Sequence, residues 1–119
     1  GEWAQAGREV VAMRRRLEAV AAQLHGLGDL DRTLANASVF LEAFGHLVVA
    51  WIWLDQALCA QAALARGGAQ LHPGEQAFYN GKLQAARFFL RWELPRTGPM
   101  IELLRSVDTT ALDMRDAWF

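Results

Sequence analysis

A carboxylate and a histidine at helical spacing are the first candidates for chemistry in this sequence. Glu42 and His46 are four residues apart, so an α-helix would place both on one face, where they could bind a metal ion. A metal site inside a helical bundle needs several further inward carboxylates or histidines, and no Glu-x-x-His pair occurs. His25 and His72 lie near expected helix ends. We therefore predict surface or capping roles for the histidines and no metal site.

Two groups of arginines could instead bind a phosphate or an acidic partner. The three arginines at residues 14–16 are consecutive, so they fan over roughly 200° of a helix and do not converge on one anion. The second group lies among aromatic residues with Glu93 nearby, and consists of Arg87, Arg91 and Arg96. Ion pairing and packing of the aliphatic stems explain this group without a ligand. We interpret both groups as solvated or ion-paired surface.

Nucleophilic and cofactor-binding patterns are absent from the sequence. Ser38 and Ser106 have no His and Asp partners at readable spacing, and Cys59 has no basic neighbour. No glycine-rich phosphate loop, dinucleotide fingerprint or CxxC pair occurs. One aromatic set could stack a flat cofactor, although such spacing is more often that of a core: Phe78, Phe88 and Trp92. We expect no catalytic and no cofactor-binding residue in the chain.

Composition indicates one helical domain and excludes several classes of partner. The 119 residues fit a single domain, and a formal net charge of −1 argues against a nucleic-acid binder, which needs a positive field. The lone Cys59 cannot form an internal disulfide and is expected to be a buried, inert thiol in a reducing compartment. The uncharged stretch around Trp51 is shorter than the roughly 20 residues of a membrane span. Without a targeting signal, we expect a cytoplasmic protein with no membrane span.

Apolar residues recur at helical spacing almost throughout the chain, and no window shows the sustained alternation of a strand. Glycines at Gly26 and Gly67 are typical helix stops, and the short connections there imply antiparallel neighbours. We expect Pro95 and Pro99 to kink or break the chain. The helices are predicted over roughly residues 3–24, from 29 or 31 to about 65, from 73 to the first of these prolines, and over about 100–107. The first of them is expected to bury one apolar seam, which includes Trp3, Val10 and Leu17. The predicted fold is all-α: an up-and-down bundle of three long antiparallel helices plus a shorter fourth helix.

The second helix carries more apolar surface than one seam uses. Trp51 and Trp53 are two residues apart, so they lie on nearly opposite faces. Trp51 is assigned to the bundle core together with Phe44, and Gly45 and Gly81 are expected where two helices cross closely. The fourth helix and the tail could cover the surplus, but we favour contact with another domain or subunit. The predicted contact surface consists of Val49, Trp53, Leu83, Leu90, Leu94, Trp118 and Phe119.

Three segments resemble a known family. The runs ANASVFLEAFGHLVVAWIWLDQAL (residues 35–58), FYNGKLQAARFFLRWELP (78–95) and ALDMRDAWF (111–119) resemble the extra C-terminal helical domain of certain bacterial acyl-CoA dehydrogenases. The resemblance implies a parent enzyme that binds FAD and removes hydrogens from the α and β carbons of an acyl-CoA thioester. In that chemistry a carboxylate base takes the α proton and the flavin accepts the β hydride. The flavin-binding and catalytic domains of the family are not in residues 1–119, so no functional residue is carried over.

The resemblance implies a structural, non-catalytic domain at residues 1–119, excised from the C-terminus of a longer enzyme. Its partners would be the acyl-CoA dehydrogenase core, a second subunit, or both, in a homo-oligomer. A freestanding helical protein that dimerises through its apolar face is an alternative. A ligand- or metal-binding four-helix enzyme is a third possibility, which the small number of histidines disfavours.

Overall fold

The chain is helical over most of its length, and no strand occurs in the computed structural model, which describes residues 1–119. The helices are α1 (Glu2–His25), α2 (Leu30–Leu34), α3 (Ala37–Gly67), α4 (Pro73–Phe88) and α5 (Thr97–Arg105). Short 3₁₀ turns follow at Gly68–Gln70, Leu94–Arg96 and Asp116–Trp118, and a π-helical turn at Phe89–Glu93. The predicted all-α fold with three long helices is confirmed.

The predicted second helix is two helices, because polar side chains interrupt it. Asn36 has a non-helical backbone, and its side-chain amide donates a hydrogen bond to the carbonyl of Asp108 at 2.7 Å. The Thr33 hydroxyl donates to the carbonyl of Leu24 at 2.8 Å. These side chains bond to distant backbone groups, and the helix ends where such competition occurs. The side chain of Asp29 caps the short helix α2, as expected for this residue type.

The helices α4 and α5 form one bent rod instead of two separate elements. His72 caps α4 and Pro73 occupies its first turn, as predicted. The backbone N–H of Leu94 bonds to the carbonyl of Phe89, five residues back, and this widened turn precedes Pro95. Proline cannot donate to an ordinary helical ladder, so the widened turn allows the chain to bend and stay helical. The expected kink occurs, but the chain does not break there.

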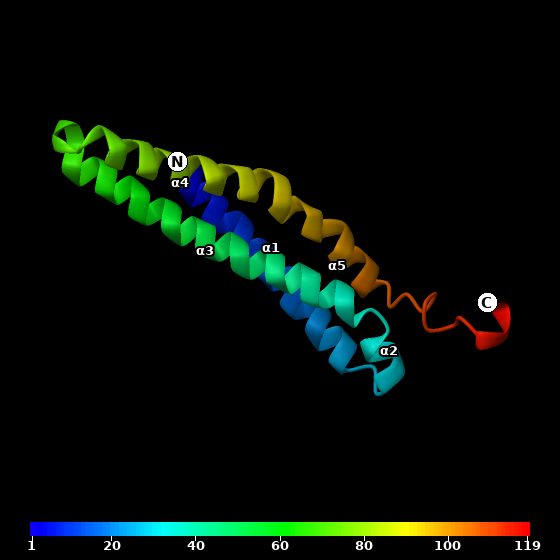
Figure 1. The fold of residues 1–119 in the computed structure, drawn as a ribbon. Helices are drawn as coiled ribbons and strands as arrows, with labels where there is room; N and C mark the ends of the chain where they lie inside the picture. Colours follow the sequence, from blue (N-terminus) through cyan, green and yellow to red (C-terminus); the bar gives the residue numbers. More distant parts are fainter.

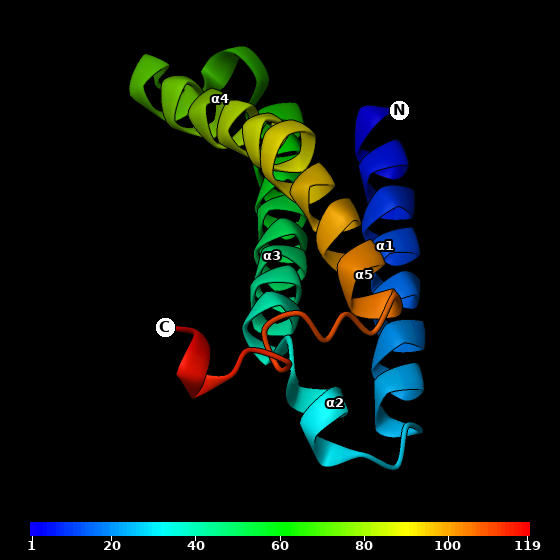
Figure 2. The same cartoon turned by 90° about the vertical axis from the view of Figure 1, so that its right-hand side faces the viewer.

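The helices make a thin and elongated domain around α3. Both α1 and α4 pack against α3, and α5 lies against α1 and α3 together (Figures 1 and 2). The domain measures 68 × 30 × 17 Å, and its radius of gyration is 19.4 Å, against about 13–14 Å for a compact chain of this length. It exposes 7937 Å² of surface, whereas a compact monomer of this mass exposes about 6,400 Å².

Small residues of α3 make the closest helix contacts. The predicted seam of α1 is confirmed, since Trp3, Val10 and Leu17 are buried. The buried residues of α3 are mainly alanines, namely Ala43, Ala50, Ala57 and Ala60, beside Leu47. The glycines predicted to mark a close crossing do not do so, because a Cβ added at Gly45 or Gly81 would meet no atom within 4 Å.

The large residues of α3 and α4 lie on the faces opposite to those predicted. Trp51 is 65% exposed and Phe44 is 50% exposed, so the predicted core stripe is wrong at these positions. Trp53 instead packs against the core. On α4 and the turns that continue it, Phe78, Phe88 and Trp92 are exposed. Three leucines of the same segment are buried in the chain's own core: Leu83, Leu90 and Leu94. These leucines therefore present almost no surface to a neighbour, which corrects that part of the predicted contact surface.

The C-terminal segment leaves the bundle and does not dock on it (Figure 1). Val107 ends α5 with φ of 53°, a left-handed conformation that is rare for a β-branched residue. The chain then runs outwards to Trp118 and Phe119, both exposed. Cys59, predicted to be buried, is exposed as well.

The apolar stretch of α3 is longer than the uncharged stretch around Trp51. By length and composition alone, the segment Ala37–Gln70 is long and apolar enough to cross a membrane, and 17% of its most apolar window is buried. One such helix is weak evidence for a membrane span, because the core helix of a water-soluble protein passes the same test.

We expect Ala50→Leu to destabilise the domain, because Ala50 has no exposed surface and α3 has no room for a larger side chain there. Overpacking of this kind costs about 1–3 kcal/mol of the free energy of unfolding. Urea denaturation followed by circular dichroism would measure the loss. The control is Ala62→Leu on the exposed side of the same helix, which should change stability by less than about 0.5 kcal/mol. Equal effects of the two substitutions would contradict this account of the core.

Candidate functional site

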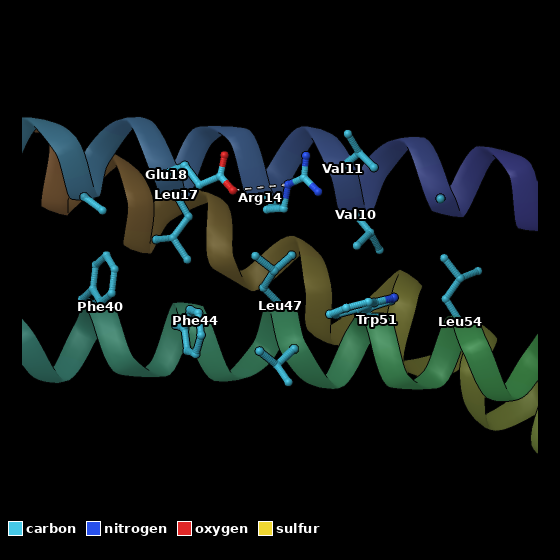
Figure 3. Close-up of a pocket in the computed structure, with 13 residues that line it drawn as sticks. Val10, Val11, Arg14, Leu17, Glu18, Phe40, Phe44, Leu47, Trp51 and Leu54 are labelled. Carbon is cyan, nitrogen blue, oxygen red and sulfur yellow. Dashed lines mark ion pairs between the residues drawn. The ribbon is translucent and has the colours of Figure 1, made fainter.

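An apolar groove lies between α1 and α3. Its volume is about 570 Å³, and ten of its thirteen lining residues are hydrophobic. Figure 3 shows α1 and α3 side by side, with α5 behind the gap. The floor is made by buried or half-buried residues of both helices, and the rim by exposed ones. The lining residues are Gly7, Val10, Val11, Arg14, Leu17, Glu18, Ala21, Phe40, Phe44, Leu47, Val48, Trp51 and Leu54.

The aromatic residues that were assigned to the core form one side of this groove. Phe44 and Trp51 are seven residues apart on α3, so they lie on one face of it, two turns from each other. Both are exposed along the opening, which Trp51 borders in Figure 3. The sequence contained this stripe, but its helical period alone did not show whether the stripe faces the core or the solvent.

The groove is chemically suited to binding apolar groups and not to catalysis. Its only charged residues are Arg14 and Glu18, whose side chains pair at 3.4 Å. No histidine, cysteine, serine or threonine lines it. The residues also do not fit the pyrophosphate of FAD, which needs unpaired cations or a set of free backbone N–H groups. The arginine is already paired, and the lining residues lie within helices whose N–H groups are used.

The structure separates the predicted contact residues. Val49 is 38% exposed and lies outside the groove, and the ammonium group of Lys82 lies 5.7 Å from the ring centroid of Trp53. Trp118 and Phe119 lie far along the C-terminal segment (Figure 1). With the three leucines buried, the seven residues do not form one surface. What remains of that prediction is an exposed contact surface at Val49, Trp118 and Phe119, which stays a prediction.

A second exposed aromatic group lies on α4 and the π-helical turn that follows it. The rings of Phe88 and Trp92 are stacked, with centroids 5.9 Å apart and an angle of 15° between their planes. Phe78 is exposed two to three turns earlier, beneath the ammonium group of Lys82. These residues are the set in which the sequence indicated either a core or a stacking platform. They form no part of the core, and none of them lines the groove.

His46 joins α3 to the π-helical turn instead of pairing with the Glu42 carboxylate. Its Nδ1 lies 3.0 Å from the backbone carbonyl of Glu42, and its Nε2 lies 3.1 Å from Oε2 of Glu93. Arg96 donates to the same carboxylate oxygen at 3.0 Å. These two hydrogen bonds, first that of His46 and then that of Arg96, lower the pKa of Glu93. No group of three or more potential metal ligands occurs anywhere in the chain.

The arginines of the two groups are ion-paired, except Arg15, which is exposed to solvent, as the sequence indicated. Arg87 donates to both carboxylate oxygens of Glu2, at 2.8 and 3.0 Å, and lies over the ring of Trp3. Its hydrogen bonds lower the pKa of Glu2, and the pKa of Arg87 is raised in return. This pair links the first turn of α1 to α4. In the other group, Arg16 pairs with Glu102 of α5 at 3.2 Å.

Comparison with known proteins identifies relatives for most of the chain. A family profile described as "Acetyl-CoA dehydrogenase C-terminal like" matches residues 2–115. A broad-specificity linear acyl-CoA dehydrogenase of Mycobacterium tuberculosis is 32% identical over 80 residues, which are 67% of this chain and 13% of that protein. A butyryl-CoA dehydrogenase of Syntrophomonas wolfei is 31% identical over 83 residues, 70% of this chain and 13% of that protein. The chain thus matches about an eighth of the length of these relatives. No solved structure matches.

We expect Glu93→Gln to reduce the acid sensitivity of the fold. The pKa of Glu93 is lower in the folded protein than in the unfolded chain, so its stabilising contribution is present above the unfolded pKa of about 4.3 and is lost as the pH falls through the folded value. Wild type and variant should therefore differ in their free energy of unfolding at pH 7 and converge towards pH 3. Urea denaturation at both pH values would measure this.

The control for this experiment is Glu42→Gln, which removes a carboxylate that makes no ion pair. This variant measures how the loss of one negative charge, without the loss of an ion pair, changes the free energy of unfolding. If wild type and Glu93→Gln lost stability in parallel between pH 7 and pH 3, the carboxylate would not be held as the structure indicates.

Proposed function

The chain belongs to the acetyl-CoA dehydrogenase C-terminal-like family, and we propose that it is the C-terminal helical domain of an FAD-dependent acyl-CoA dehydrogenase. The parent enzyme would remove hydrogens from the α and β carbons of an acyl-CoA thioester. In this proposal the domain is structural: it binds the rest of the enzyme and stabilises its assembly. Both relatives are named as acyl-CoA dehydrogenases, which supports the reaction class.

The observation that carries the structural role is the amount of apolar surface the domain leaves exposed. Seventeen large hydrophobic residues are exposed, and Phe44 and Trp51 among them line the groove between α1 and α3. The domain exposes about 1,500 Å² more than a compact monomer of its mass, which is close to the total area of a standard protein–protein interface. Surface of this kind is stabilised when another body removes it from water.

The chemistry would reside outside residues 1–119. The groove contains no acid–base or nucleophilic group besides an ion pair, and its residues do not fit the flavin's pyrophosphate. The flavin, which accepts a hydride in this class of reaction, would be held by the remainder of the enzyme. The exposed, unpaired thiol of Cys59 supports a reducing, cytoplasmic location.

A freestanding protein that dimerises through the same surface is the alternative function. It would also cover the exposed aromatic residues. The match to two much longer relatives favours a domain of a larger chain, since each match occupies only 13% of the relative. We further propose that the parent enzyme is a homo-oligomer, in which a second subunit covers part of the remaining surface.

Deletion of residues 1–119 from the full-length enzyme tests the structural role. We expect the truncated enzyme to retain less flavin, to have a smaller oligomeric mass, or both, and to turn over more slowly, because its partner surface for the domain becomes exposed. Flavin absorbance, light scattering and steady-state turnover would measure the three effects. Full-length enzyme with Gln61→Ser, a change at an exposed polar position of α3, is the control. If all three quantities stayed unchanged on deletion, the structural role would be wrong.

A further inference from the structure

We propose that the groove between α1 and α3 is the seat of one further α-helix of about four turns, supplied by the part of the same enzyme chain that lies outside residues 1–119. The inference rests on the proposed function, in which the domain is joined to a larger body. It goes further by naming the surface, the shape of the occupant and its source.

The walls of the groove have the spacing that a helix needs. Along α1 the residues beside the opening follow one another at steps of four and three: Gly7, Val11, Arg14, Glu18 and Ala21. Along α3 the residues on the matching side do the same: Phe40, Phe44, Leu47, Trp51 and Leu54. Val48 lies beside this row and also lines the groove. Rows at steps of three and four form the ridges and grooves into which the side chains of a neighbouring helix pack. The floor between them is apolar, and includes Val10 and Leu17.

The length and the volume of the groove agree on the size of the occupant. From Gly7 to Ala21 and from Phe40 to Leu54 there are fourteen residue steps on each helix, which at 1.5 Å per residue gives about 21 Å, or about four turns. The volume of about 570 Å³ is roughly four times that of a cavity of about 150 Å³ that holds one benzene molecule. Four large apolar side chains, one per turn, would therefore fill the groove.

The charged residues at the rim indicate which sides of the bound helix are polar and apolar. Arg14 and Glu18 lie on the α1 side, about halfway along the groove, and pair with each other in contact with solvent. A seated helix would keep this pair at its polar border, while its apolar stripe covered Trp51 and Phe44. The occupant is thus an amphipathic helix, apolar on the side that faces the floor and polar on the outer side.

A segment of the same chain fits this seat better than a second copy of the domain. A second copy could offer the outer stripe of α4, which has matching spacing and length: Phe78, Gly81, Ala85, Phe88 and Trp92. However, α4 and α5 lie on the side of the α1–α3 pair away from the groove (Figure 3). A contact between two such different surfaces repeats from copy to copy, so it ends only if the copies close into a ring and otherwise continues as an open filament. A tethered segment of the same chain closes after one contact and benefits from a high effective concentration.

The first test compares two tryptophans in the full-length enzyme. Trp51 in the groove is 65% exposed in this domain and Trp92 on α4 is 68% exposed, so a glutamate at either position leaves the domain's own core intact. We expect Trp51→Glu to raise the rate at which trypsin releases the domain by about tenfold or more, as for the loss of an interface hot spot. Trp92→Glu should leave that rate within about twofold of wild type, and Trp51→Glu should leave the oligomeric mass unchanged.

Two results would overturn the proposal. Equal release rates for Trp51→Glu and Trp92→Glu would mean that no helix occupies the groove. A fall in oligomeric mass with Trp51→Glu would mean that a second subunit occupies it. The deletion of residues 1–119 separates these failures from a failure of the proposed function: if deletion affects flavin retention or mass while Trp51→Glu has no effect, the function stands and the helix seat is wrong.

A second measurement tests whether a helix occupies the groove, and it places no charge there. Phe44→Cys in the groove and Phe88→Cys on α4 replace side chains of similar exposure, 50% and 55%. Both are made in full-length enzyme with Cys59→Ala, and the rate of maleimide modification of each new thiol is followed by peptide mass. We expect the thiol at residue 44 to react about tenfold more slowly than that at residue 88, because opening of the interface must precede its reaction. Equal rates would overturn the proposal.

Discussion

The close approach of neighbouring helices to α3 is the constraint on which the rest of the structure depends. Ala43, Ala50 and Ala57 follow one another at intervals of seven residues, and none of them leaves more than 1% of its surface exposed. Small side chains allow helix axes to approach closely and to exchange dispersion contacts along the whole seam. The same choice leaves no room for phenylalanine or tryptophan in the seam. The bulky residues of α3 are therefore on its flanks, where only part of their surface is covered.

This arrangement explains the thin shape of the domain and its groove. A slab 17 Å thick has little interior, and only 18 of its 119 residues are buried. The apolar surface that would fill the centre of a thicker bundle lies between α1 and α3 or on the outside of α4. Polar links across the helix ends, such as the pair between Glu2 and Arg87, hold the rods in place but are partly solvated and add little stability. The domain is thus a single thin layer of helices with apolar residues on both of its faces.

The sequence predicted the positions of the helices better than it predicted which side of each helix is buried. The apolar residues of α1 occupy one arc of the helix, so their spacing alone identified the buried side correctly. On α3 they surround the whole helix, and the period of 3.6 residues then carries no information about direction. Size, not hydrophobicity, decided that Ala50 is buried and Trp51 is not. The groove was missed for the same reason. The break at Asn36 depends on a hydrogen bond to Asp108, 72 residues away, which no local pattern shows.

The π-helical turn at Phe89–Glu93 determines which side of α5 faces the core. One residue corresponds to about 100° around a helix, so the extra residue in the turn sets the phase at which α5 begins. With this phase, Ile101 and Leu104 point at the same core as Leu83 and Leu90. His46 bonds to Glu93 within the turn, so α3 holds the turn at the point where the phase changes. A lineage that lost a single residue here would keep both helical segments but direct the apolar side of α5 towards the solvent.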